Sequence, residues 1–140
     1  MQDYQGILNE IHSSLSHAEN IGEVANYIPE LAKVDKDNLG IHLQLITGEN
    51  FSVDDSSEKF SIQSISKVLS LAKAFGLEGD NLWTRLDVEP SGNPFNYLSL
   101  LEREDGIPRN PLINAGAIVV ADVLLSHLNN PKEDFLDFVR

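Results

Sequence analysis

The chain contains no cysteine, few basic residues and no long hydrophobic run, and each absence excludes a class of protein. Without cysteine the chain cannot form a disulfide framework, a thiolate metal site or a thiol nucleophile. Its 10 lysine and arginine residues are outnumbered by 22 aspartate and glutamate residues, which gives a net charge of −12. This charge repels phosphate groups and anionic lipids, and no basic patch offsets it. We therefore expect neither a nucleic-acid-binding protein nor a membrane-binding one.

No stretch of the sequence approaches the ~20 apolar residues of a membrane-spanning helix. The first residues also lack the basic and apolar runs of a secretory signal. Both observations predict a cytoplasmic protein, and the lack of cysteine is compatible with a reducing compartment. The composition is otherwise that of a globular domain, because 41% of the 140 residues are hydrophobic and 23% are charged.

The spacing of apolar residues predicts a helix-rich chain. Helical patterns occur at about 5–19, 23–34, 61–75, 114–128 and 132–140, with shorter helical stretches at 82–88 and 97–103. Pro29 interrupts the second pattern, so that helix should restart or kink there. Gly76 is the expected C-cap of the third. The small residues at the start of the 114–128 pattern predict a helix that packs closely against a neighbour.

One segment has the two-residue period of a β-strand. Alternating residues at 39–46, a turn at 47–50 and a return at 51–53 predict an antiparallel hairpin. A two-stranded hairpin is marginally stable by itself. We therefore expect further strands beyond residue 140, in a longer parent protein.

Ser64 and Lys67 are the most informative pair of polar residues. Three positions apart on a helix, they share a face with Cβ atoms about 5 to 6 Å apart, so the amine can reach the hydroxyl. A serine hydroxyl becomes a nucleophile when a base removes its proton, and a lysine is such a base only when it is uncharged. The pair therefore indicates nucleophilic catalysis. The alternative is a helix-capping serine followed by a solvated lysine.

Four motifs in the same order resemble the serine-dependent glutaminases: NYIPELA at 26–32, FSIQSISK at 60–67, PSG at 90–92 and RNPLINAGA at 109–117. The similarity runs from about Gly22 to the last residue. It implies a mixed α/β (α+β), helix-rich chain with the fold of serine β-lactamases and penicillin-binding proteins. It also implies an enzyme that hydrolyses L-glutamine to L-glutamate and ammonia through a serine acyl-enzyme, without a metal or organic cofactor.

The resemblance also implies roles for individual residues. Ser64 matches the nucleophile, in contact with substrate and with its own N–H as one oxyanion donor, and Lys67 matches the base. Tyr27 and Gln63 match positions that line the pocket and orient the substrate or the reacting groups. Asn114 matches a substrate-binding asparagine. Simpler interpretations are a core aromatic for Tyr27 and a helix N-cap for Asn114.

The family's other substrate-binding residues come later in the chain than residue 140: a glutamate, another asparagine, two tyrosines and a second oxyanion donor. We therefore expect residues 1–140 to be the N-terminal part of a single glutaminase domain, and the fold to be incomplete in this chain. The family also implies a homo-oligomer. The four histidines are scattered, so we expect no metal site.

Two alternative functions remain at this point. The first is a β-lactamase or peptidase with the same Ser-x-x-Lys arrangement, although the Ser-Asp-Asn and Lys-Thr-Gly motifs of those enzymes are absent from the sequence. The second is a non-catalytic fragment that acts only as a folding or assembly unit.

Overall fold

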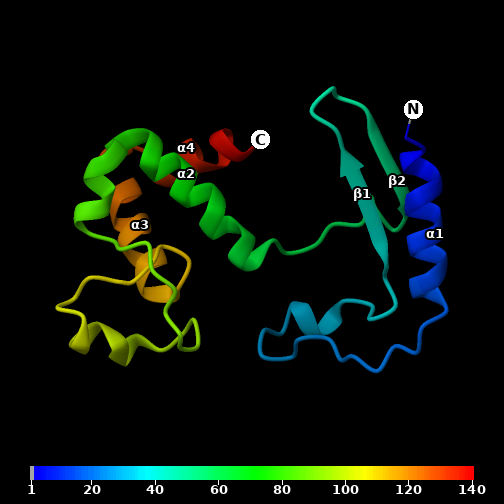
Figure 1. The fold of residues 1–140 in the computed structure, drawn as a ribbon, viewed down its shortest axis with the longest axis horizontal. Coiled ribbons are helices and arrows are strands. Elements are labelled where there is room, and N and C mark those ends of the chain that lie inside the picture. Colours follow the sequence, from blue (N-terminus) through cyan, green and yellow to red (C-terminus); the bar gives the residue numbers. More distant parts are fainter. Residues whose placement is uncertain (1) are drawn as a thin grey trace. The chain divides into compact units, whose positions relative to one another are not determined.

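The computed structural model describes residues 2–140, apart from the side chain of Leu100, and divides them into two compact units. We call residues 2–61 the N-terminal unit and residues 62–140 the C-terminal unit. The chain is mixed α/β and rich in helices, as expected (Figure 1). No helix in the described part of the chain combines the length and the apolar character needed to cross a bilayer.

The N-terminal unit consists of helix α1 (Tyr4–Ser16) and the hairpin of β1 (Gly40–Gln44) and β2 (Asn50–Asp54). The strands are antiparallel, and Leu43 pairs with Phe51. This confirms the predicted hairpin. Helix α1 packs beside β2, where the rings of Tyr4 and Phe51 have centroids 5.6 Å apart.

The helix predicted over 23–34 is wrong. The structure has only a 3₁₀ turn there, η1 (Leu31–Lys33). Pro29 has no N–H to donate and disfavours a helical conformation in the residue before it. The turn starts after that point, since the carbonyl of Ile28 accepts from the N–H groups of Leu31 and Ala32 at 3.0 and 3.2 Å. The apolar spacing in this segment therefore does not reflect a helical face.

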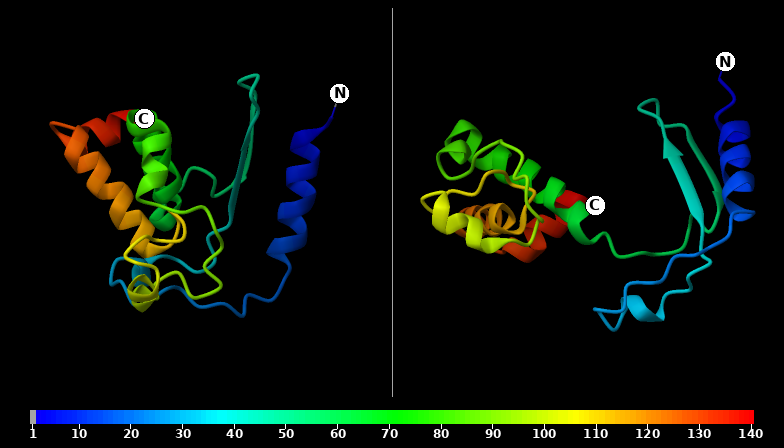
Figure 2. Two further views of the ribbon diagram at one scale, coloured as in Figure 1. Left: turned by 60° about the vertical axis from the view of Figure 1, so that its left-hand side comes forward. Right: turned by 60° about the horizontal axis from the view of Figure 1, so that its bottom comes forward.

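The C-terminal unit is a small helical assembly. Its elements are η2 (Gln63–Ile65), α2 (Ser66–Glu78), η3 (Gly79–Thr84), η4 (Leu98–Arg103), α3 (Asn114–His127) and α4 (Pro131–Val139). Helix α2 packs against α3 and α4 (Figure 2). Between them lies a cluster of buried apolar side chains: Ala74, Leu82, Leu86, Val120, Val123 and Leu124.

Most helices predicted for this unit are confirmed, with shifted ends. The 61–75 pattern becomes a 3₁₀ turn followed by α2, which continues through Gly76 and stops at Gly79, where φ is 57°. Gly76 is therefore not the C-cap. The short helices expected at 82–88 and 97–103 are the 3₁₀ helices η3 and η4.

Helix α3 approaches the preceding loop closely, as its small residues predict. A Cβ on Gly116 would lie 2.0 Å from the carbonyl oxygen of Asn110 and 2.7 Å from the Cα of Pro111. Only glycine allows this approach, since real Cβ atoms are never found so near a backbone atom. The contact fixes the first turn of α3 against the 110–111 segment.

Candidate active site

Four of the five predicted site residues belong to the C-terminal unit. Gln63 and Ser64 form the 3₁₀ turn that leads into α2, Lys67 lies in the first turn of α2, and Asn114 is the first residue of α3. Tyr27 belongs to the N-terminal unit and is 72% exposed, so it is not a core aromatic. The structure brings Lys67 and Asn114 into direct contact.

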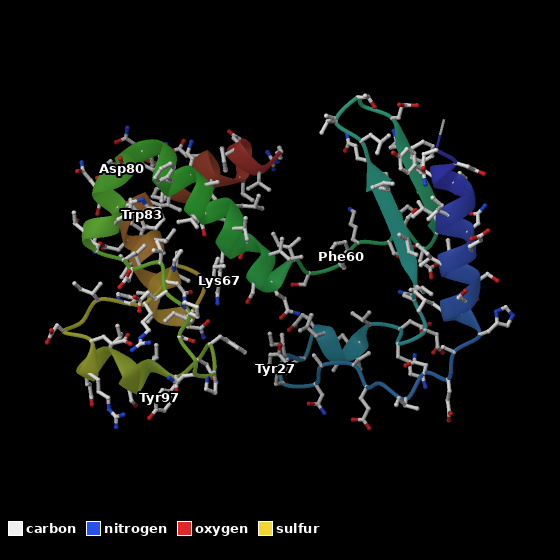
Figure 3. All side chains as sticks on the ribbon, viewed as in Figure 1. Tyr27, Phe60, Lys67, Asp80, Trp83 and Tyr97 are labelled. Atoms are coloured by element: carbon white, nitrogen blue, oxygen red, sulfur yellow. The ribbon has the colours of Figure 1, made fainter. Side chains whose placement is uncertain are left out.

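The Nζ atom of Lys67 has two hydrogen-bond acceptors. It donates to Oδ1 of Asn114 at 2.7 Å and to the main-chain oxygen of Leu112 at 2.9 Å. It also lies 5.6 Å from the centre of the Phe95 ring. Figure 3 shows Lys67 projecting from helix α2. A freely solvated lysine, the simpler interpretation of the Ser64–Lys67 pair, is therefore wrong.

The two acceptors leave one position open on the Lys67 nitrogen. An ammonium group has three N–H donors, whereas an uncharged amine has two N–H donors and one lone pair. With two donors engaged, the remaining position is a third N–H in the first case and the lone pair in the second. That single position can release or accept one proton, which is what a catalytic base must do.

The amide of Asn114 is oriented by its partner. A lysine nitrogen held this way donates, so the group facing it must be the oxygen Oδ1, which leaves Nδ2 as a donor for another molecule. The N-cap interpretation of Asn114 is wrong, because Ile113 occupies the N-cap of α3. The main-chain N–H of Asn114 donates to the carbonyl oxygen of Phe95 at 2.8 Å.

The backbone before Ser64 is strained. Gln63 has a φ of 41°, in the left-handed region that non-glycine residues rarely adopt. Such residues occur often at active sites, where surrounding contacts hold them in place. Here the hydroxyl of Ser66 donates to the carbonyl oxygen of Gln63 at 2.6 Å. Ser64 is not a helix cap, because the N-cap positions of η2 and α2 are Ile62 and Ile65.

Two groups that contact Lys67 were not predicted from the sequence. The carbonyl of Leu112 lies within the 109–117 motif, but a main-chain oxygen has no residue type that could reveal it. Phe95 follows the 90–92 motif closely, and only the fold shows that its ring lies near Lys67. Within the described residues, no group of three or more histidine, cysteine, aspartate or glutamate side chains could hold a metal ion.

Comparison with known proteins gives one consistent result. A sequence model of the glutaminase family matches residues 22–140. The chain is 56% identical over 138 residues to a glutaminase of Christiangramia forsetii, and the match covers 99% of this chain and 45% of that protein. The chain thus spans about half the length of this curated relative.

Solved structures give the same match. The structure of the probable glutaminase ybaS has a TM-score of 0.87 at 30% identity, covering 96% of this chain and 44% of that one. Mglu in its tris and glutamate form has a TM-score of 0.80 at 35% identity, covering 99% of this chain and 30% of that one. These matches confirm the expected fold class, a helix-rich α/β chain with a β-lactamase-like fold.

Proposed function

The chain belongs to the glutaminase family, and from this premise we propose that the protein containing it hydrolyses L-glutamine to L-glutamate and ammonia. The observation that carries the proposal concerns Lys67, which follows Ser64 by three residues: its Nζ atom donates to Asn114 and to the main chain of Leu112. We further propose that residues 1–140 form part of one glutaminase domain whose remainder lies beyond residue 140.

In the proposed reaction Ser64 is the nucleophile and Lys67 is the base. The Oγ atom of Ser64 attacks the side-chain amide carbon of glutamine, while the uncharged amine of Lys67 takes the hydroxyl proton. The N–H of Ser64 donates to the oxyanion that forms. The C–N bond then breaks, and the nitrogen leaves as ammonia with the proton from Lys67. Ser64 now carries a glutamyl ester.

Water completes the cycle. It adds to the ester carbon while Lys67 accepts one of its protons, and the bond to Ser64 Oγ then breaks. Lys67 returns the proton to Ser64, and glutamate is released. The two acceptors on Lys67 support this role, because they leave its nitrogen one position through which the proton can pass in both half-reactions.

Three further residues bind or orient the substrate in this proposal. Asn114 offers its Nδ2 donor to an oxygen of glutamine, since its Oδ1 is held by Lys67. Gln63 and Tyr27 orient the substrate or the reacting groups. The structure of Mglu in a glutamate form supports a glutamine-sized ligand, because glutamate is the product of the proposed reaction.

Ammonia release from glutamine by the full-length protein tests the proposal. Ser64→Ala should abolish it and Lys67→Ala should lower it by about 10²–10⁴-fold, whereas Ser126→Ala, at an exposed serine on α3, should leave it unchanged. Hydrolysis of a chromogenic β-lactam without ammonia release would indicate the β-lactamase alternative. Undiminished activity in Ser64→Ala would disprove the mechanism.

The cellular setting is part of the same proposal. We place the protein in the cytoplasm, supported by its lack of cysteine, and we propose a homo-oligomer, as the family resemblance implies. Cell fractionation and light scattering of the purified full-length protein test these two statements separately.

A further inference from the structure

Asn110 ties together the segment that faces Lys67. Its Oδ1 accepts from the N–H of Leu112 at 3.0 Å and from the N–H of Ile113 at 3.1 Å. Its Nδ2 donates to the main-chain oxygen of Glu89 at 2.8 Å. One half-buried side chain thus joins the loop before α3 to the segment around Glu89.

The segment around Glu89, which accepts the hydrogen bond from Asn110, is itself held in place. Two main-chain hydrogen bonds of 2.8 Å join the neighbouring stretches, from the N–H of Asp87 to the oxygen of Pro108 and from the N–H of Glu89 to the oxygen of Arg109. Leu86, next to Asp87, is 1% exposed and belongs to the core cluster. The anchor of Asn110 is therefore connected to the packed part of the unit.

Both acceptors of Lys67 lie in or directly after the segment that the Asn110 side chain holds. Leu112 gives its N–H to Asn110 and receives a hydrogen bond from Lys67 on its carbonyl oxygen. Asn114, the other acceptor, directly follows Ile113, whose N–H Asn110 also holds. The N–H of Ile113 and the carbonyl of Leu112 belong to the same rigid peptide unit, so the side chain that holds this N–H also fixes the carbonyl that Lys67 contacts.

Asparagine suits this position for two reasons. Its side-chain oxygen reaches N–H groups two and three residues ahead and closes a tight turn, as in an Asx-turn. Its amide nitrogen can donate at the same time, which an aspartate cannot do. Pro111 provides no N–H, and the lack of a Cβ on Gly116 lets the first turn of α3 lie directly against the carbonyl of Asn110.

We propose that Asn110 is a positioning residue for the glutaminase reaction: it holds Leu112 and Asn114 where they orient the open position of the Lys67 nitrogen toward Ser64. Asn110 acts through Lys67 and Asn114 and does not itself contact glutamine. This inference rests on the proposed function, in which Lys67 is the base.

The test compares Asn110→Ala with Thr84→Ala in the full-length protein. Thr84→Ala is a matched control, because it also removes one side-chain-to-main-chain hydrogen bond from the same unit. The hydroxyl of Thr84, which is exposed, donates to the main-chain oxygen of Asn81 at 2.8 Å. In Asn110→Ala, kcat per folded molecule should fall about tenfold to a hundredfold and by more than KM rises, because a small misplacement of a catalytic group slows the chemical step. Thr84→Ala should leave both constants unchanged.

A crystal structure of full-length Asn110→Ala gives a readout independent of activity. The Nζ atom of Lys67 should have left the carbonyl oxygen of Leu112, which it meets at 2.9 Å here. An unchanged kcat, a rise in KM alone, or Lys67 still in place would each overturn the inference. If the unmodified protein releases no ammonia, the proposed function fails, while a displaced Lys67 would still show that Asn110 positions it.

Asn110→Asp separates the acceptor hydrogen bonds of Asn110 from its donor hydrogen bond. It also provides a second test if Asn110→Ala does not fold. It keeps the acceptor for Leu112 and Ile113 and loses the donor to Glu89. Since the acceptor bonds are the ones next to the Lys67 contacts, this variant should keep Lys67 in place and a kcat nearer that of the unmodified protein. Loss of the Lys67 contacts in Asn110→Asp, or a kcat as low as that of Asn110→Ala, would contradict the assignment.

Discussion

The two units of the chain differ in how firmly each holds its side chains. In the C-terminal unit six apolar side chains from α2, α3 and the segments between them form a buried cluster. Among the described residues of the N-terminal unit, Leu8 alone is buried. Ser64, Lys67 and Asn114 lie on the better-packed unit, at the starts of two helices that pack together. Groups that must be placed accurately for chemistry are best supported by such rigid elements.

Two lysines on the same helix provide the strongest test of this contrast. In the full-length protein Lys67→Ala should lower kcat by about 10²–10⁴-fold, the usual contribution of a general base. Lys73→Ala is the matched control, because its Nζ atom also lies near a phenylalanine ring, 5.1 Å from that of Phe138, and has no part in the site. Equal losses of kcat in the two variants would show that α2 contributes structure alone.

A pair of leucines compares the packing of the two units. Leu82→Ala should lower the free energy of unfolding by about 2–5 kcal/mol, because it leaves a cavity within the buried cluster. Leu8→Ala should cost about 1.5–3 kcal/mol, the transfer contribution alone, since no other buried side chain surrounds it. Urea unfolding of both full-length variants measures the difference. A larger cost for Leu8→Ala would reverse the comparison.

Two glycines test whether the close approach of α3 to the 110–111 segment matters. Gly116→Ala should destabilise the protein by about 1–3 kcal/mol, because its Cβ would overlap the carbonyl of Asn110. Gly76→Ala lies inside α2 with nothing within 4 Å of the new Cβ, so it should stabilise the protein by roughly 0.5–1 kcal/mol. Thermal denaturation gives both signs, and a neutral Gly116→Ala would contradict the contact.

Two tyrosines of the N-terminal unit test whether that unit takes part in catalysis. Tyr27→Phe removes a hydroxyl that we propose orients the reacting groups, so kcat should fall about tenfold, the value of one hydrogen bond. Tyr4→Phe keeps the ring that packs on Phe51 and should leave kcat unchanged. If both variants are fully active, the hydroxyl of Tyr27 has no part in the reaction.

The sequence predicted the parts of the fold that local patterns determine. The hairpin at 39–53 and helix α3 are confirmed. In both, the apolar pattern keeps one period over many residues and ends at residues that favour turns. The 23–34 helix is wrong because a proline outweighs apolar spacing. The sequence predicts Gly76 as a C-cap, yet α2 continues through it, because a mid-helix glycine costs only about 1 kcal/mol.

The site shows the same division between local and distant information. Ser64 and Lys67 are three residues apart, so helical geometry alone relates them. The motif at 109–117 predicts Asn114 as a site residue. Its hydrogen bond to Lys67 spans 47 residues and follows from the packing of α2 on α3. The Leu112 carbonyl and the tie made by Asn110 involve main-chain atoms, whose positions no residue pattern encodes.

A covalent ester on Ser64 is the most direct test of the central claim, that this serine is the nucleophile and the lysine one turn later its base. The full-length protein is mixed with glutamine, quenched in acid within its first turnovers, digested and mapped by mass spectrometry. We predict the added mass of one glutamyl group on the peptide that contains Ser64, and no such peptide from Ser64→Ala. Continued release of ammonia by Ser64→Ala at the rate of the unmodified protein would contradict the account.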